Sequence, residues 1–125
     1  MRAVNLVVEN DSRMADLAEG VDGVGASAGT YVGPVRIVDG PHEFAKVHAG
    51  DVLVCRTTAS PWEVLFPSIG ALVTEGGGLL SHPAIVAREH GLPAVLAGAE
   101  AMVRFHDGQL VTVDGAAGTV RPVQT

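Results

Sequence analysis

The chain contains the segment Gly76-Gly77-Gly78-Leu79-Leu80-Ser81-His82-Pro83-Ala84-Ile85-Val86-Ala87-Arg88. Three glycines lead through a short link to a histidine, and the residues after it have the pattern of an amphipathic helix. Proline is favoured at the first position of a helix, because its missing N–H would have no intrahelical acceptor there. The segment therefore predicts a glycine-rich turn followed by a helix that begins at His82 or Pro83, and Gly91 is expected to close this helix as a left-handed cap.

This arrangement is typical of a site that binds an anion. Glycines let backbone amides approach a phosphate closely, and a helix start offers unpaired N–H groups and the positive end of its dipole. Imidazole is largely neutral near pH 7 and is then a nucleophile. We therefore predict that His82 is the reactive group and that a phosphoryl group is what it takes up.

Several neighbours are candidates to support this chemistry. A hydroxyl of Ser81, or a backbone carbonyl, is expected to hold one ring nitrogen and leave the other free. Thr58 and Thr74 lie at the ends of predicted strands and can donate hydroxyls, whereas Arg88 either reaches the phosphate or forms a structural salt bridge. The predicted phosphate-binding or supporting residues are Gly76, Gly77, Gly78, Ser81, Thr58, Thr74 and Arg88.

Composition restricts the classes of partner. The 125 residues have a net charge of −6 and only 4% aromatic residues, which argues against a nucleic-acid partner. The single cysteine, Cys55, lies in an apolar run and is expected to be a buried core residue. One cysteine cannot form an internal disulfide, which fits a reducing compartment. No secretory signal or apolar run of membrane-spanning length is present, so the sequence predicts a cytoplasmic location without a membrane partner.

The chain divides into an N-terminal extension, residues 1–22, and a main domain, residues 23–125. Residues 5–8 are expected to form an edge strand and residues 11–18 a short helix. The glycine-rich residues 20–33 indicate a loop or a series of turns. Homo-oligomerisation is left open.

Alternation of strand and helix patterns predicts the fold of the main domain. The apolar runs 52–55, 71–74 and 93–96 are typical of buried parallel strands, and residues 31–38 are a further predicted strand. Short helical segments are expected at 41–47 and from Ser60, and a hairpin is expected from 110–113 and 119–122. We therefore predict an α/β fold in three layers, β/β/α, with a central, mostly parallel sheet.

Three other kinds of site are disfavoured by spacing. The five histidines show neither H-x-x-x-H nor H-E-x-x-H spacing, so no metal site is predicted. The glycine run is not closed by Gly-Lys-Ser/Thr, as a P-loop requires. Ser81 lacks the Gly-x-Ser-x-Gly context of a hydrolase nucleophile.

The segment Thr74–Val95, from Thr-Glu-Gly-Gly-Gly to Gly-Leu-Pro-Ala-Val, resembles the phosphohistidine signature of the swivelling, mobile domain of phosphoenolpyruvate-utilising enzymes. The resemblance covers roughly residues 20–122 and includes 50–54, 107–115 and 118–120. A motif of this length is far more specific than a lone glycine-rich loop. The Leu79-Leu80-Ser81-His82 version is most similar to the rifampicin phosphotransferase and phosphoenolpyruvate synthase types.

The resemblance implies that His82 is a phosphoryl carrier on a domain that swings between two sites. An ATP- or phosphoenolpyruvate-utilising partner, which also binds Mg²⁺, would load it, and the phosphate would pass to a second site that binds pyruvate or another acceptor. No cofactor is expected in this chain itself. Leu80 stands where dikinases and synthases typically have a regulatory threonine, so that mode of regulation is not expected. Proline also follows Thr58 by three residues (Pro61) instead of two.

The chain is too short to hold the nucleotide-binding domain or the phosphoenolpyruvate-binding barrel of most relatives. It is expected to be a stand-alone phosphotransferase component that needs partner subunits or domains for turnover, or else a fragment of a larger phosphotransferase. A non-catalytic binding or regulatory relative that uses the glycine turn as a contact is a further alternative. Leu79 and Leu80, apolar residues beside the histidine, indicate a docking face for a partner.

Overall fold

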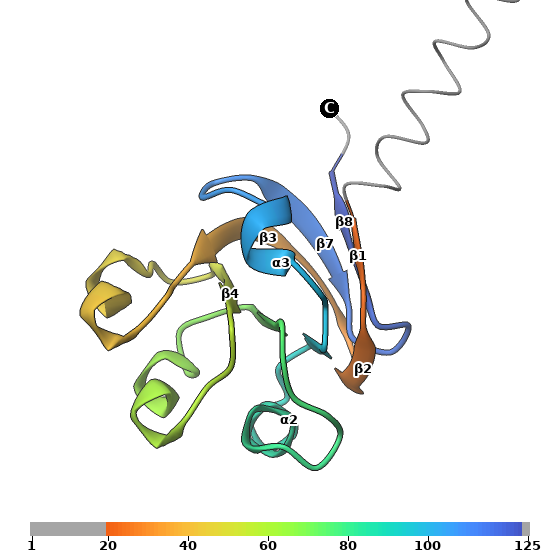
Figure 1. Cartoon of the computed structure of the whole chain (residues 1–125), viewed down its shortest axis with the longest axis horizontal. Coiled ribbons are helices and arrows are strands. Elements are labelled where there is room, and N and C mark those ends of the chain that lie inside the picture. The colour runs from red at the N-terminus through yellow and green to blue at the C-terminus, as the bar shows by residue number, and fades with distance from the viewer. Residues whose placement is uncertain (1–19, 124–125) are drawn as a thin grey trace, which may run out of the picture.

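A computed structural model of the chain describes residues 20–123 (Figure 1). The strand expected at residues 5–8 and the helix expected at 11–18 lie outside that range. Eight strands are present in it: β1 (Val21–Asp22), β2 (Val24–Ser27), β3 (Thr30–Ile37), β4 (Val52–Cys55), β5 (Ala71–Thr74), β6 (Ala94–Leu96), β7 (Leu110–Asp114) and β8 (Thr119–Pro122). The helical elements are the 3₁₀ helices η1 (Pro41–Lys46) and η2 (Ser60–Leu65) and the α-helices α2 (His82–Glu89) and α3 (Ala101–Arg104).

The strands form one sheet in the order β1-β8-β7-β3-β4-β5-β6-β2. Strands β3, β4, β5 and β6 are parallel to one another, whereas every other neighbouring pair is antiparallel. Strand β3 belongs to both halves, because its first part pairs with β7 and its last three residues pair with β4. Strands β1 and β2, at opposite edges, are separated in the chain by Gly23 alone, so the sheet curls back on itself (Figure 1).

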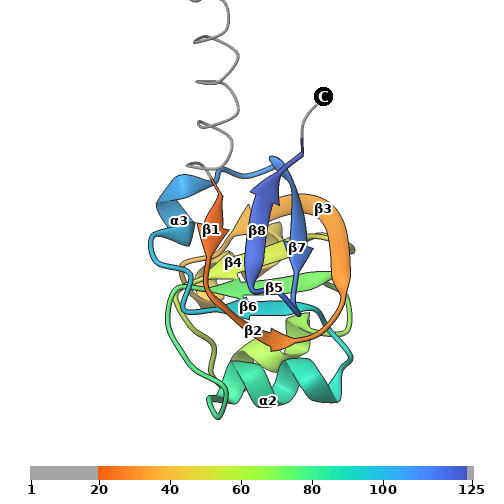
Figure 2. The ribbon, with the colours of Figure 1, turned by 90° about the vertical axis from the view of Figure 1, so that its right-hand side faces the viewer.

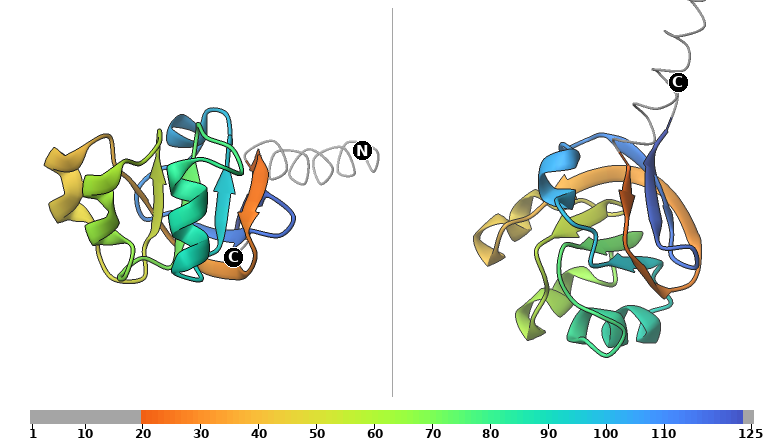
Figure 3. Two further views of the ribbon diagram at one scale, coloured as in Figure 1. Left: turned by 90° about the horizontal axis from the view of Figure 1, so that it is seen from below. Right: turned by 45° about the vertical axis from the view of Figure 1, so that its right-hand side comes forward.

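The curled sheet gives two β layers, and the helices supply the third. Figure 2 shows β7 and β8 running across β4, β5 and β6, and Figure 3 shows η1, η2 and α2 side by side on the outer face of the parallel strands. The parallel strands have one hydrophobic core on each face, and side chains of β4 alternate between the two. Val52 and Val54 face the antiparallel half of the sheet, whereas Leu53 and Cys55 face the helices. All four side chains are fully buried.

The predicted α/β fold with β/β/α layers is therefore confirmed, with one difference. The two β layers are halves of a single sheet, and the parallel arrangement is confined to the central strands. Strand β1 pairs with β8 and so joins the sheet, although the sequence placed residues 21 and 22 in the extension.

The prediction of a loop over residues 20–33 is wrong, because these residues form β1, β2 and the start of β3. Their glycines permit close packing. A Cβ on Gly23 would lie 2.3 Å from the carbonyl oxygen of Leu96, and one on Gly25 would lie 2.4 Å from that of Gly115. Glycine at these positions marks the approach of another backbone, which the sequence pattern alone does not distinguish from a turn.

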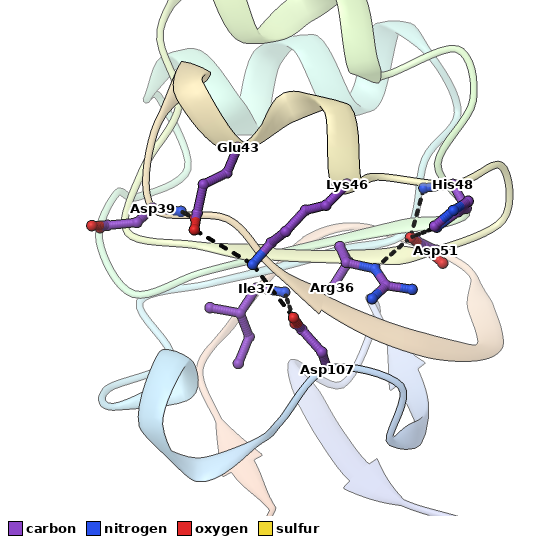
Figure 4. Close-up of polar contacts among 8 residues, drawn as sticks. All are labelled: Arg36, Ile37, Asp39, Glu43, Lys46, His48, Asp51 and Asp107. Carbon is purple, nitrogen blue, oxygen red and sulfur yellow. Dashed lines mark hydrogen bonds and ion pairs between the residues drawn. The ribbon is translucent and has the colours of Figure 1, made fainter.

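A polar cluster fastens η1 to the sheet (Figure 4). Asp107, in the turn before β7, accepts hydrogen bonds from the backbone N–H of Ile37 (2.7 Å) and from Lys46 Nζ (3.4 Å). Asp51 is nearly fully buried and accepts hydrogen bonds from Arg36 Nε (3.0 Å) and the backbone N–H of His48 (2.8 Å). These contacts join β3, η1 and the start of β4.

Candidate functional site

The site forms where two parallel strands end side by side. Cys55, the last residue of β4, is in register with Thr74, the last residue of β5. The pairing continues beyond both strands, since the N–H of Glu75 donates to the carbonyl of Cys55 (3.0 Å) and that of Gly76 to Arg56 (2.9 Å). The carboxyl ends of parallel strands are the usual location of ligand sites in α/β folds. This register brings the segment after β4 beside the glycine turn.

Short hydrogen bonds shape the glycine turn. Thr74 Oγ1 donates to the carbonyl of Gly76 (2.5 Å), and Ser81 donates to the carbonyl of Gly78 through both its backbone N–H (3.0 Å) and its Oγ (2.6 Å). Gly77 has a φ of +99°, a conformation that side chains with a Cβ rarely adopt. The turn therefore needs glycine at position 77, whereas a Cβ on Gly78 would meet open space.

Helix α2 begins at His82, as predicted, with Ser81 as its N-cap residue and Pro83 in its first turn. The first backbone amide of the helix with a carbonyl acceptor is that of Ile85, which donates to Ser81 (3.1 Å). The helix ends at Glu89 with His90 as its C-cap residue, and Gly91 follows with a φ of +64°. The amides of Gly91 and Leu92 donate back to the carbonyls of Arg88 and Ala87. This is the predicted left-handed glycine cap.

The two nitrogens of the His82 ring have different surroundings. Nδ1 is hydrogen-bonded to Thr58 Oγ1 at 3.2 Å, and the tautomer decides which of the two donates. Nε2 has less than 1 Å² of accessible surface and no hydrogen-bond partner within residues 20–123. The nearest carboxylate oxygen, Glu63 Oε2, lies 4.0 Å from it. The side chain as a whole is 33% exposed, so the ring is not sealed in the core.

The predicted supporting residues fall into two groups. Thr58, which is buried, contacts the ring, and the glycine turn leads into the helix that carries it. Ser81 and Thr74 instead use their hydroxyls on backbone carbonyls of the turn, so the expectation that Ser81 holds the ring is replaced by the Thr58 contact. Arg88 forms no salt bridge in the described part of the chain. It donates to the carbonyls of Ala26 (2.8 Å) and Leu79 (2.7 Å).

Glu63 is the residue at this site that sequence reasoning missed. The sequence predicted only a short helical segment from Ser60, and that segment is the 3₁₀ helix η2 with Ala59 as its N-cap residue. Its neighbour Trp62 is buried and packs edge-on against Phe44, with ring centroids 5.0 Å apart. Trp62 therefore fixes η2, and η2 places Glu63 beside the ring. No local pattern connects residues 63 and 82.

Four apolar side chains are exposed in the segments that carry the site: Leu79 and Leu80 just before α2, Ile85 within α2, and Val64 next to Glu63 in η2. Leu80 is 88% exposed, and Leu79, Ile85 and Val64 are also exposed. Exposed apolar side chains, when they form a contiguous patch, are typical of a surface that another protein covers.

Cys55 takes no part in the site. It is fully buried, and burial, with a smaller effect of the Glu75 carboxylate, raises the pKa of its thiol to about 12. The thiol is therefore protonated and unreactive at neutral pH.

Within residues 20–123, no three His, Cys, Asp or Glu side chains gather as metal ligands. None of the helices in this range is long and apolar enough to span a bilayer.

The arrangement can support nucleophilic chemistry at Nε2. When the proton is on Nδ1, the N–H donates to Thr58 Oγ1 and Nε2 keeps its lone pair. The unpaired amides and dipole at the start of α2 favour an anion nearby. The structure thus holds the imidazole at Nδ1 through a neutral hydroxyl and leaves Nε2 without a hydrogen-bond partner in the described residues.

Sequence relatives share most of this chain. It is 46% identical over 101 residues to the phosphotransferase YvkC of Bacillus subtilis strain 168, covering 81% of this chain. It is 44% identical over 109 residues to a rifampicin phosphotransferase of Streptomyces sp., covering 86%, and 45% identical over 101 residues to the phosphoenolpyruvate synthase of Aeropyrum pernix, covering 80%. In each case the match spans 12% of the relative's length.

Solved structures share the fold. Enzyme I in its solution structure matches with a TM-score of 0.53 and 28% identity, over 60% of this chain and 31% of that one. Aconitase X of Thermococcus kodakaraensis matches with a TM-score of 0.66 over 84% of this chain and 98% of that one. At 16% identity, the second likeness concerns the fold alone.

The family model of the mobile domain of PEP-utilising enzymes matches residues 47–118, which include β4, Thr58, the glycine turn and all of α2. Together with the relatives above, this match shows that the chain belongs to the family of mobile domains of PEP-utilising enzymes.

Proposed function

We propose that this chain is a phosphoryl carrier, phosphorylated on His82 by an ATP- or phosphoenolpyruvate-utilising partner protein or domain. The phosphate then passes to an acceptor at a second site. The observation that carries the proposal is the asymmetric environment of the ring, with Nδ1 hydrogen-bonded to Thr58 and Nε2 without a hydrogen-bond partner. Membership of the mobile-domain family supports the same role.

In the loading step, the Nε2 lone pair attacks the phosphorus of the donor. The N–P bond forms while the P–O bond of the donor breaks, and the leaving oxygen keeps the electron pair. The ring then carries a positive charge with its remaining proton on Nδ1, where Thr58 Oγ1 accepts the hydrogen bond. In the unloading step an acceptor oxygen attacks phosphorus, and the electron pair of the N–P bond returns to Nε2.

The exposed apolar side chains around the start of α2 support docking of this face on partner sites. We propose that Leu79, Leu80, Ile85 and Val64 contact the partner. The partner would supply the nucleotide or phosphoenolpyruvate together with Mg²⁺, and water would be excluded from the reacting phosphate on docking.

The test uses two phosphoryl donors. In one arm the purified chain is treated with potassium phosphoramidate. In the other it is mixed with the phosphoenolpyruvate synthase of Aeropyrum pernix and radiolabelled phosphoenolpyruvate. We expect acid-labile, alkali-stable phosphate on the wild type and none on His82→Ala. His90→Ala, which changes an exposed histidine at the other end of α2, is the matched control and should be labelled normally.

Absence of label from the wild type in both arms would contradict the proposal and favour a binding module. Label that persists in His82→Ala would place the carrier elsewhere.

A further inference from the structure

We infer that Glu63 is a positioning residue that opposes a phosphoryl group on His82 Nε2 and thereby favours its onward transfer. The inference rests on the proposed function. It begins with geometry: Glu63 Oε2 lies 4.0 Å from Nε2, the one ring nitrogen without a hydrogen-bond partner in residues 20–123.

Within residues 20–123, no lysine or arginine forms an ion pair with the Glu63 carboxylate. Its single ion-pair neighbour in the described part of the chain is the His82 ring, because no lysine or arginine there lies within 4.0 Å of it. Arg56, at the end of β4, pairs with Asp39 instead, at 2.8 Å. The negative charge of Glu63 therefore acts on the ring and on anything attached to it.

Before loading, that charge favours a proton on Nε2. A proton there removes the lone pair that must attack phosphorus, and the nitrogen is also covered by its surroundings. A donor phosphate reaches Nε2 only after the ring or the Glu63 side chain moves. Both side chains are partly exposed, at 33% and 46%, so such a movement does not require the core to open.

After loading, the carboxylate and the phosphoryl oxygens are like charges at close range. Two unit charges 4 Å apart in water change an equilibrium by roughly fivefold, and partial burial enlarges the effect. Repulsion destabilises the phosphorylated state and is relieved when phosphate leaves. Glu63 thus keeps the carrier empty unless a docked partner moves or neutralises the carboxylate.

The experiment measures how long the phosphoryl group survives. Wild type, Glu63→Gln, Glu63→Asp and Glu89→Gln are phosphorylated with phosphoramidate, the donor is removed by desalting, and the remaining phosphohistidine is followed by ³¹P NMR. Glu89 is exposed on α2, and its replacement by Gln makes the same change in net charge. We expect the half-life to lengthen roughly fivefold in Glu63→Gln. It should stay near the wild-type value in Glu89→Gln and return toward that value in Glu63→Asp.

A second measurement separates this role from a structural one. In ¹H–¹⁵N spectra of the unphosphorylated chain, Glu63→Gln should shift the neutral His82 ring toward the tautomer that is protonated on Nδ1. Equal half-lives in wild type and Glu63→Gln, with tautomers unchanged, would overturn the inference and leave the carrier function intact. If the wild type takes up no phosphate at His82, the proposed function itself fails.

Discussion

At the scale of single residues, the Thr58–His82 hydrogen bond organises the site. Thr58 is buried and its hydroxyl lies 3.2 Å from Nδ1, so it orients the ring through that nitrogen. A neutral hydroxyl can accept from the Nδ1 N–H or donate to a bare Nδ1. Thr58 can therefore remain bonded when the ring gains or loses a phosphoryl group.

Thr58→Val should slow the labelling of His82 by phosphoramidate by roughly threefold to tenfold, the rate equivalent of one lost hydrogen bond. Valine has nearly the same shape, so the fold should persist. Thr57→Val, at the exposed neighbouring position, is the control and should be labelled at the wild-type rate. A normal rate in Thr58→Val would show that the hydrogen bond does not orient the nucleophile.

Cys55 gives a second prediction at this scale, because its thiol pKa is raised to about 12 from an ordinary value of 9.0. At pH 8 the native thiol should not react with Ellman's reagent, whereas the chain unfolded in urea should react at once. The raised pKa also means that the folded state loses stability as the pH rises from about 9 toward about 12, since the unfolded thiol ionises first. Rapid reaction of the native chain would contradict the burial.

At the scale of elements, the glycine turn and α2 act as one unit. Thr74 and Ser81 stabilise the turn by donating hydrogen bonds to its backbone carbonyls. Arg88 of α2 donates to the carbonyl of Leu79 and to that of Ala26 in β2, so it connects the residues before α2 with β2. Three of the residues predicted to support phosphate binding, Thr74, Ser81 and Arg88, thus hold the backbone of residues 76–79 in place. Their effect on the chemistry is expected to pass through the position of the turn.

Gly77→Ala and Gly78→Ala form a matched pair that tests the turn. At Gly77 the φ of +99° is strained for alanine, and the added Cβ would lie 3.0 Å from Ser81 Oγ. We expect Gly77→Ala to lower the free energy of unfolding by about 1–2 kcal/mol and to slow His82 labelling. Gly78→Ala, with open space around the Cβ, should change neither quantity measurably. Equal effects of the two substitutions would argue against a conformational requirement at position 77.

Elements with a strong local pattern could be predicted from the sequence, and elements set by distant contacts could not. Apolar runs identified β4 and β5, and Pro83 and Gly91 marked the start and end of α2. Helix α3 was missed because it is four residues long and its first turn is capped from afar: Glu75 Oε2 accepts a hydrogen bond from the Met102 amide at 2.8 Å. The role of Glu63 was missed for the same reason, since it depends on how η2 packs.

At the scale of the whole molecule, the two β layers and the helix layer are joined away from the site by the polar cluster of Figure 4. Asp107 contacts the backbone of β3 and the Lys46 side chain of η1 from the turn that leads into β7. It therefore links elements from all three layers. A carrier that moves between sites as one body needs such links, because relative motion within it would misplace the histidine.

Asp107→Asn should lower the free energy of unfolding at pH 7 by a few tenths of a kcal/mol to about 1 kcal/mol, because the pair with Lys46 is partly exposed and screened by solvent. Burial raises the pKa of Asp107, but the hydrogen bond from Ile37 and the charge of Lys46 outweigh it and hold the pKa below its ordinary value of 3.8. A lowered pKa stabilises the fold above about pH 4 and loses that effect as the pH falls through the folded-state value. The difference between wild type and Asp107→Asn in urea titrations should therefore shrink in acid, and a constant difference would contradict this account.

The most direct measurement is a long-range ¹H–¹⁵N NMR spectrum of the chain after treatment with phosphoramidate, since it reports which ring nitrogen of which histidine has been modified. We predict a single phosphorylated ring, that of His82, with the phosphoryl group on Nε2 and the proton on Nδ1 toward Thr58. Phosphorylation on Nδ1, preferential phosphorylation of another histidine, or no modification of His82 would contradict the account.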